Sequence, residues 1–430
     1  MRLRLAALAA CLPAISAAAQ PPHVPPAARA EARLEAIGTA PSAARIEADI
    51  RKLVSFGTRH TLSDTQSDTR GIGAARRWVF DEFQRISKAC GGCLEVRYVS
   101  GTISGEKRIP DPVEVVNVIA VQRGTTDPNR YVLMSGDIDS RVTDVMNATS
   151  DAPGANDDAS GVAGTLEAAR ILSKHKFAGS IVYAGLSAEE QGLFGGKLVA
   201  EHAQKEGWRL EAVLNNDMIG NSRGLNGVSD NHTVRVFSDG TRVTETAEEA
   251  RQRRFTGGEI DSPSRNLARY IARMSRYVPN LDVMMVYRLD RFGRGGHHRP
   301  FNDAGYPAVR VMETNEHYDR QHQDLRTENG RVYGDTLDGV DFDYAAKLTA
   351  LNAVSLAGMA LAPPPPAQVS IEGAVTADTT LKWTRPAAKQ AANLAGYKLY
   401  WRLTTEPQWT HSREVGDVSE ATLKNVVIDN

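Results

Sequence analysis

Between residues 43 and 361, short apolar runs alternate with longer segments in which apolar residues recur at helical spacing. The runs at residues 115–121, 131–135 and 181–186 are apolar almost throughout, as expected of strands buried on both faces. Shorter runs of the same kind occupy residues 212–214 and 308–312. The helical pattern is found at residues 44–56, 73–86, 160–175, 190–205 and 262–277. This order predicts an α/β fold in three layers, with a mixed, mostly parallel sheet sandwiched by helices.

The composition is that of an ordinary globular protein and argues against two classes of partner. Hydrophobic residues make up 41% of the chain and charged residues 24%, which is enough for a large core. Lys and Arg number 51 and Asp and Glu 52, so the formal charge is −1 and nothing in it favours nucleic acid or an anionic membrane. Outside the N-terminus no apolar run is long enough for a transmembrane helix, and none is expected.

The N-terminus has the pattern of an export signal. Residues 1–19 combine a basic start, an apolar middle and the small residues Ala17-x-Ala19, which predicts a signal peptide cleaved after Ala19. The protein is therefore expected in the periplasm or outside the cell. An alternative is a lipobox at residues 8–11, which would leave a lipidated Cys11, although the apolar stretch before it is short. Residues 20–42, rich in Pro and Ala, are expected to be a leader.

Beyond the signal peptide, the chain has two cysteines, Cys90 and Cys93, in the sequence CGGC. This spacing also occurs in redox motifs and in halves of zinc sites. A zinc site of that kind needs a second cysteine pair, which the chain lacks, and an exported protein is oxidised. A local structural disulfide between the two is therefore the preferred interpretation.

After the proline run at residues 363–366, the sequence changes to short alternating strand patterns separated by turns. We expect residues 362–366 to be a stiff linker between a domain at residues 43–361 and a small all-β module at 367–430. The module resembles part of a fibronectin type III domain, with Trp383 and Tyr397 as core aromatic residues. A complete domain of that type has about seven strands. The four or five predicted before Asn430 indicate a truncated C-terminus.

Four clusters of acidic residues follow predicted strands. They lie at residues 135–140, 154–161, 188–193 and 215–217, and histidine-rich segments follow at 295–301 and 317–324. Ligands of α/β sheets bind at the carboxyl ends of the strands. Carboxylates gathered there repel one another unless a cation neutralises them, so the pattern indicates a metal site. Adjacent Glu189 and Glu190 can divide the work, one binding a metal and the other taking a proton. Each cluster alone could also be a solvated turn or a helix cap.

Three of these segments together resemble a known enzyme family. GANDDASG at residues 154–161, AEEQGLFGG at 188–196 and NNDMIG at 215–220 are similar to motifs of the zinc aminopeptidase family of the MH clan, peptidase family M28. The segments HHRPFNDAGYPAVR and EHYDRQHQD fall where that family places its later site loops. The resemblance extends over about residues 43–361.

The resemblance implies a centre of two divalent metal ions, with zinc as the expected metal. Asp157 would bridge the two ions, and Asp217 would complete one of the two sites. Glu190 and His322 would complete the other, with His317 as the alternative to His322. These assignments follow from matching motifs and not from spacing alone.

The chain departs from the family pattern at two places. Asp137 stands where the family has a ligand histidine, and His297-His298 stands where it has Asp-His. Asp137 could itself bind metal, and a site so rich in oxygen would favour manganese or cobalt. Alternatively one metal is lost, or the protein is catalytically dead. We hypothesise an exchange in which His297 supplies the missing imidazole and Asp137 the displaced carboxylate; otherwise His297 is a solvent-facing loop residue. His298 is a further metal or substrate contact to be tested.

The activity implied by the resemblance is that of a secreted or periplasmic metallo-aminopeptidase that hydrolyses N-terminal peptide bonds of peptides or proteins. Glu189 would be its general base, and Asp139 matches a carboxylate that lies beside the family's metal ligands. A glutaminyl cyclase, which uses a related fold, is one alternative. A dead peptidase scaffold acting as a binding module is the other. The sequence determines neither the oligomeric state nor the preferred substrate side chain.

Overall fold

The computed structural model describes residues 26–373, 376–388 and 390–426. The predicted signal peptide, with Cys11, lies outside the described residues, as does the first part of the predicted leader. Within the described ranges, no helix combines the length and the hydropathy that crossing a bilayer requires.

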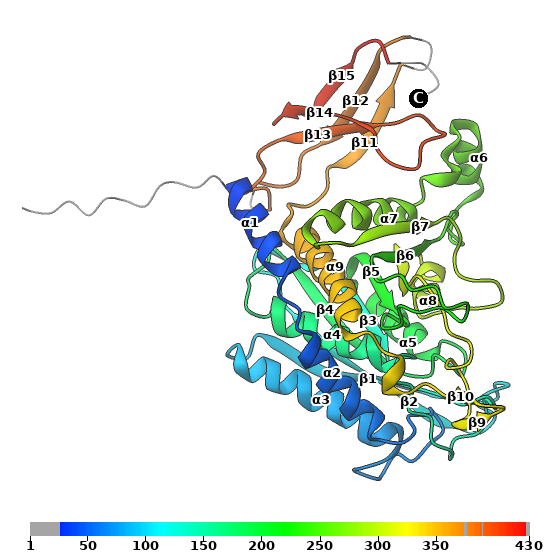
Figure 1. Cartoon of the computed structure of the whole chain (residues 1–430). Helices are drawn as coiled ribbons and strands as arrows, with labels where there is room; N and C mark the ends of the chain where they lie inside the picture. Colours follow the sequence, from blue (N-terminus) through cyan, green and yellow to red (C-terminus); the bar gives the residue numbers. More distant parts are fainter. Residues whose placement is uncertain (1–25, 374–375, 389, 427–430) are drawn as a thin grey trace, which may run out of the picture.

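A mixed, mostly parallel eight-stranded sheet forms the centre of the molecule (Figure 1). Its strands, in spatial order, are β1 (Leu94–Ile103), β2 (Val113–Gln122), β4 (Gly179–Leu186), β3 (Asp127–Asp137), β5 (Arg209–Asn216), β8 (Ala308–Glu313), β6 (Thr233–Ser238) and β7 (Asp282–Val286). β4, β3, β5 and β8 are parallel to one another, and β6 is parallel to β7. The pairs β1–β2, β2–β4 and β8–β6 are antiparallel. The predicted fold class is confirmed.

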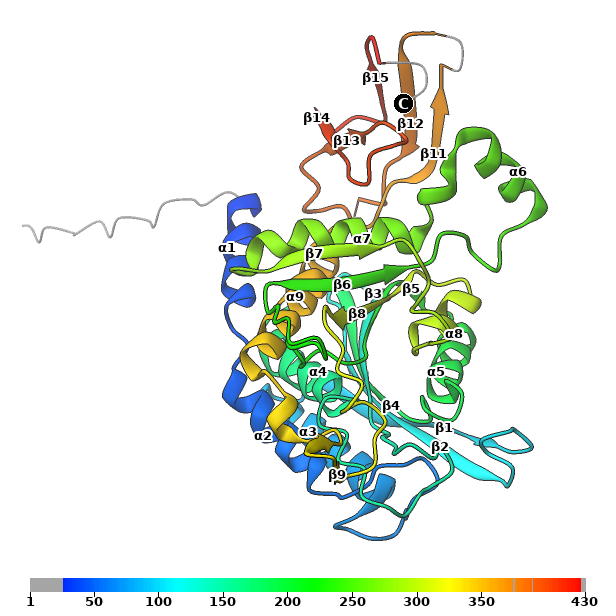
Figure 2. The ribbon, with the colours of Figure 1, turned by 45° about the vertical axis from the view of Figure 1, so that its right-hand side comes forward.

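Helices cover both faces of this sheet (Figure 2). One apolar core lies beneath α2 (Ala43–Val54), α3 (Gly71–Ala89), α4 (Ala159–Leu172), α7 (Pro263–Met274) and α9 (Phe342–Leu361). A second core lies on the opposite face, beneath α5 (Phe194–Lys205) and α8 (His298–Asp303). The remaining elements are α1 (Pro26–Gly38), α6 (Ala247–Thr256), the hairpin of β9 (Arg326–Glu328) and β10 (Arg331–Tyr333), and short 3₁₀ helices at Gly258–Ile260, Ser275–Tyr277 and Leu337–Gly339.

The predicted strands are those that are buried on both faces. β4 and β8 are buried at every position, and β3 and β5 nearly so, because helices lie above and below them. β1 and β7 contain exposed positions, and no strand was predicted for β1, β6 or β7. The sheet is therefore wider than the apolar runs of the sequence indicate.

The C-terminal strands form two small sheets above α7 in Figure 1. β11 (Ala367–Glu372), β12 (Thr379–Thr384) and β15 (Glu420–Leu423) make one, and β13 (Tyr397–Trp401) pairs with β14 (His411–Gly416) in the other. Trp383 and Tyr397 pack edge to face, with ring centroids 5.0 Å apart, in the small apolar core of this module. The fibronectin type III resemblance stays a prediction, because only these small sheets are seen. Arg269 of α7 donates a hydrogen bond to the Pro407 carbonyl (2.7 Å) and so joins the module to the main sheet.

The two cysteines of CGGC lie at the end of α3, in the turn that leads to β1. Cys90 is the C-cap of α3, and it is joined to Cys93 by a disulfide. The bond closes a four-residue turn on the side of the sheet that carries α3.

Candidate metal centre

The acidic clusters meet at the carboxyl ends of β3, β4 and β5. Asp137 is the last residue of β3, Glu189 and Glu190 follow β4, and Asp217 follows β5. β3 and the start of α4 approach each other very closely, because a Cβ on Gly136 would lie only 2.2 Å from the backbone of Gly161. The loop before α4, with Asp157, is thereby held against the same edge of the sheet. The clusters thus lie together at one edge of the sheet.

Asp157, Glu190 and His322 form one compact group of metal-binding atoms. Their ligand atoms all lie within 4.8 Å of one another, and they are the only group of three such residues in the described parts of the chain. His322 Nε2 lies 3.0 Å from Asp157 Oδ2 and 2.8 Å from Glu190 Oε1. Two carboxylates and an imidazole are a ligand set that zinc accepts.

The electrostatics of this group favour a bound cation. Burial disfavours a charge on His322, but Glu190 and Asp157 outweigh burial and raise its pKa to about 9. Burial likewise opposes ionisation of Asp157, yet His322 holds the Asp157 pKa well below its usual range. The two carboxylates thus hold a proton on Nε2 when no metal is bound, and a divalent ion would replace that proton. The residues fit a metal ion at this point.

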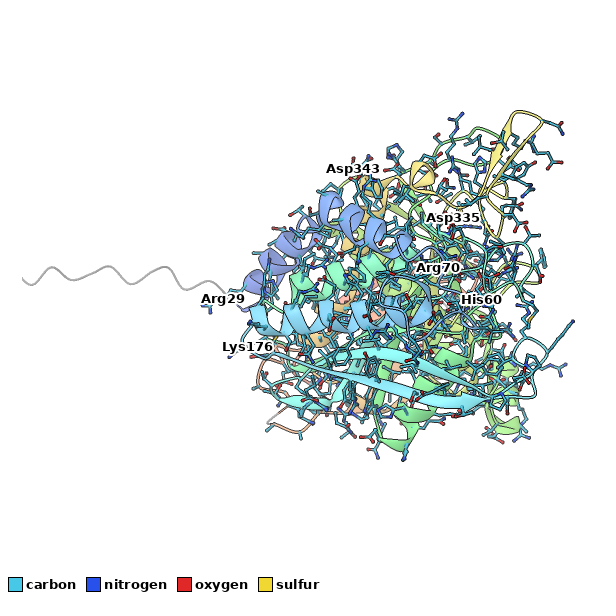
Figure 3. All side chains as sticks on the ribbon, turned by 90° about the horizontal axis from the view of Figure 1, so that it is seen from below. Arg29, His60, Arg70, Lys176, Asp335 and Asp343 are labelled. Atoms are coloured by element: carbon cyan, nitrogen blue, oxygen red, sulfur yellow. A yellow bond between two sulfur atoms is a disulfide. The ribbon has the colours of Figure 1, made fainter. Side chains whose placement is uncertain are left out.

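Several residues that the sequence analysis did not single out position the group. Arg141 donates from Nε to Glu190 Oε2 (2.7 Å), and its Nη2 lies 2.7 Å from His322 Nδ1. Asp335, labelled in Figure 3 near the hairpin of β9 and β10, accepts the backbone N–H of Asp157 (2.7 Å). Asp158 is the N-cap of α4, and its carboxylate also accepts the backbone N–H groups of Asp137 (2.7 Å) and Met218 (3.2 Å). The sequence analysis did not find these residues, because they lie far from the acidic clusters in the sequence or have the ordinary pattern of a helix cap.

Asp217 faces a cation that the protein itself supplies. Arg310 on β8 is fully buried, and its Nη2 lies 2.8 Å from Asp217 Oδ2. Arg310 Nη1 lies 3.0 Å from Asp290 Oδ2, so one guanidinium joins two buried carboxylates. An arginine within the apolar run AVRVM was a signal that could have been used, because a fully buried charge needs a partner.

Asp137 is paired with His297, from a loop 160 residues away. His297 Nδ1 lies 2.6 Å from Asp137 Oδ1, and both side chains are buried. The alternative that His297 is a solvent-facing loop residue is therefore wrong, since Gly196 of α5 and the end of β3 enclose it. Burial lowers the His297 pKa to about 4, which keeps the imidazole neutral. Its Nε2 and Asp137 Oδ2 are both buried without a hydrogen-bond partner among the described residues.

The other two histidines lie apart from the metal-binding group. His298 Nε2 lies 2.8 Å from the Leu289 carbonyl oxygen and faces Asp290 at 3.7 Å. His317 is partly exposed and lines a small cavity behind Asp157 together with Asp335. Only His322 of the late histidines thus belongs to the group with Asp157 and Glu190.

Glu189 and Asp139 lie beside the metal-binding group in different environments. Glu189 lines the cleft, and burial together with the nearby Asp217 raises its pKa well above the usual value. Asp139 accepts the backbone N–H groups of Glu189 and Glu190, each at 3.1 Å, and burial raises its pKa to about 7. Ala188, immediately before Glu189, has a φ of 58°, which is strained for a residue with a side chain. Asp139 therefore holds a strained turn that presents Glu189 to the cleft.

The group opens into a cleft of about 860 Å³ at the edge of the sheet. Its lining includes Asp157, Glu189, Glu190, Asp217 and His322, together with residues of α5 and α8. A cavity of this size accepts a few residues of a peptide. The arrangement can hold a metal ion, place a carboxylate next to it and admit a peptide to both.

Comparison with known proteins places these observations in a family. The model of peptidase family M28 matches residues 117–341. A probable zinc metalloprotease of Leptosphaeria maculans is 46% identical over 395 residues, which cover 91% of each chain. A probable zinc metalloprotease of Pyricularia oryzae is 46% identical over 384 residues, which cover 87% of this chain and 76% of that one.

Solved structures share the fold at low sequence identity. The Legionella pneumophila LapA aminopeptidase matches with a TM-score of 0.56 and 20% identity, over 79% of this chain and 74% of that chain. A Porphyromonas gingivalis glutaminyl cyclase matches with a TM-score of 0.50 and 17% identity, over 74% of this chain and 99% of that chain. At these identities the likeness concerns the arrangement of the chain and not its chemistry.

Proposed function

The chain belongs to peptidase family M28, and from that premise we propose that it is an exported metallo-aminopeptidase that removes N-terminal residues from peptides. The observation that carries the proposal is the group of Asp157, Glu190 and His322, which lies beside Glu189 in a cleft at the sheet edge. The aminopeptidase among the structural neighbours supports the same activity by analogy of fold. Export rests on the sequence pattern of residues 1–19 alone.

Asp157, Glu190 and His322 would hold a zinc ion, which would polarise the scissile carbonyl and make the attacking water more acidic. Glu189 then takes a proton from that water and later donates it to the leaving amine. Asp139 keeps Glu189 in place through two backbone hydrogen bonds. Arg141 orients both Glu190 and His322.

A second ion has less support from the arrangement of the residues. Arg310 already neutralises Asp217, and Asp137 is bonded to His297 instead of gathering with Asp157 and Asp217. No step of the reaction is therefore assigned to a second ion. If one binds, we propose that His297 provides the imidazole through its unpartnered Nε2, while Asp137 fixes the ring through Nδ1.

Chelation is expected to abolish activity and zinc to restore it. Purified protein should release nitroaniline from aminoacyl-nitroanilides, lose this activity after dialysis against a chelator, and regain it on addition of zinc. Activity that survives complete metal removal, as verified by mass spectrometry, would refute the metallopeptidase mechanism. Ammonia release from N-terminal glutaminyl peptides, without release of the N-terminal residue, would instead favour the glutaminyl cyclase alternative.

The exchange between Asp137 and His297 predicts a change in metal content. Wild-type protein with two ions per chain should retain one in His297→Ala, because Asp157, Glu190 and His322 are untouched. The measurement is metal content by mass spectrometry, with His411→Ala in the C-terminal module as a matched control. Equal metal content in wild-type and His297→Ala protein would exclude His297 as a ligand.

A further inference from the structure

The wall of the cleft carries several cations that lack a carboxylate partner among the described residues. Arg108, Lys197, Arg294 and Arg299 line the cleft, and none has a carboxylate within ion-pair distance among the described residues. Elsewhere in the molecule most arginines pair with an acidic side chain, as Arg170 does with Asp49. Unpaired cations gathered around a cleft create a positive potential that attracts anions.

The other charges of the cleft are already accounted for. Arg141 and Arg291 also line it, but they pair with Glu190 and Glu316. Asp157, Glu189, Glu190 and Asp217 form the metal side of the cleft, where the proposed zinc ion would neutralise the metal ligands and Arg310 pairs with Asp217. A further carboxylate of the lining, Asp303 at the end of α8, is exposed. Among the described residues, none of the four cations therefore has a carboxylate that neutralises its charge.

Arg299 gives the clearest sign of a missing partner. Its side chain is half-buried, and its Nε is buried without a hydrogen-bond partner among the described residues. An unsatisfied guanidinium nitrogen shielded from water is costly. The guanidinium packs closely against Gly295, where a Cβ would lie only 3.0 Å from Arg299 Nη1. A carboxylate that reached this point could accept two hydrogen bonds from the guanidinium fork.

Lys197 extends the same wall. It lies in the first turn of α5, is exposed and lines the cleft, while Arg299 lies in the first turn of α8. α5 and α8 pack against each other, so the two cations belong to neighbouring helices. On the metal side, Arg294 Nη1 lies 3.3 Å from His322 Nδ1, and Arg108 donates to the Glu190 carbonyl oxygen (2.6 Å). Cations therefore stand at both sides of the proposed zinc ligands.

We propose that the cleft selects peptides that carry a carboxylate close to the cleaved bond, with Arg299 and Lys197 as its receptors. The inference rests on the proposed peptidase function, because it concerns the substrate of that same cleft. The carboxylate can come from an acidic side chain on either side of the bond or from the C-terminus of a dipeptide. All three present the same charge to the α5–α8 wall.

The test measures binding without turnover, by calorimetry with reduced-amide peptides that cannot be hydrolysed. Three matched pairs separate the sources of the carboxylate: Ala-Glu-amide against Ala-Gln-amide, Glu-Ala-amide against Gln-Ala-amide, and Ala-Ala acid against Ala-Ala-amide. At least one anionic member should bind about tenfold or more tightly than its neutral partner. That ratio should approach one in Arg299→Gln and fall several-fold in Lys197→Gln.

Lys205→Gln is the matched control, because Lys205 is an exposed lysine of the same helix that does not line the cleft. It should leave every ratio unchanged. Equal binding within all three pairs, or failure of all the peptides to bind, would overturn the inference. A preference that persists in both cleft variants would overturn it as well. Hydrolysis of a neutral aminoacyl-nitroanilide, measured in parallel, tests the peptidase function separately. If Arg299→Gln does not fold, Lys197→Gln still tests whether the cleft cations cause the preference.

Discussion

Glu189→Gln is expected to lower kcat for peptide hydrolysis by about 10²–10⁴-fold, the usual contribution of a general base. The substitution preserves size and removes only the ability to take a proton. Glu189 lies in the cleft but outside the group of Asp157, Glu190 and His322, so metal content should stay at the wild-type level. Steady-state kinetics and metal analysis on the same preparation measure both effects, and KM should change little.

Two further variants separate proton transfer from metal binding and from general damage. Glu190→Gln should lose metal together with activity, because it removes a ligand charge. Glu201→Gln, on the exposed side of α5, should change neither. Wild-type turnover in Glu189→Gln would show that another group is the base. Loss of metal in that variant would show that Glu189 is a ligand instead.

Arg310→Met is expected to lower the free energy of unfolding by about 3–5 kcal/mol, the typical cost of breaking a buried ion pair from one side. Methionine fills part of the space but leaves Asp217 and Asp290 buried without their shared cation. Arg310 also donates a hydrogen bond to the Asp217 carbonyl oxygen (3.1 Å), and the substitution removes this bond to the backbone after β5 as well. Urea-induced unfolding followed by circular dichroism measures the change.

A double variant shows whether the uncompensated charge is the cause. Arg310→Met combined with Asp290→Asn should recover part of the lost stability, because one of the two buried carboxylates is then neutral. Arg85→Met, which breaks a surface pair with Glu82, should change the free energy of unfolding by less than about 1 kcal/mol. Wild-type stability of Arg310→Met would mean that water or metal replaces the guanidinium without cost.

The sheet illustrates which strands a sequence reveals. β2, β3, β4, β5 and β8 were predicted because helices cover both their faces, and selection for burial leaves a continuous apolar run. β1 pairs with β2 at the edge, and only two of its residues, Leu94 and Val99, are buried. Within a polar stretch such a pattern is not distinguishable from a loop, so the outer strands appeared only in the structure.

The edge of the sheet at which the candidate metal-binding acids gather was predictable from the sequence. Glu190 and Asp217 follow β4 and β5, which both pair in parallel with β3, and parallel strands bring their carboxyl ends to one edge. Asp157 lies in the loop between β3 and α4 and reaches the same edge through the close approach of Gly136 and Gly161. For Glu190 and Asp217 that geometry is local to the strand end, whereas Asp157 was assigned through the resemblance of its motif to the family. The sequence also indicated the group to which His322 belongs, through the resemblance of its segment to the family.

The charges that balance these acids were decided only by the tertiary structure. Arg310 reaches Asp217 across 93 residues, and His297 reaches Asp137 across 160. The roles of Arg141 and of the cleft cations that lack a carboxylate partner likewise depend on the residues that the folded chain places opposite them. Strand ends are fixed by short-range patterns of burial, whereas the partner of a charge depends on which distant loop the packed core brings to it. The sequence therefore indicated where a metal could bind. Only the fold showed which of the acidic side chains there are already paired with a side chain of the protein.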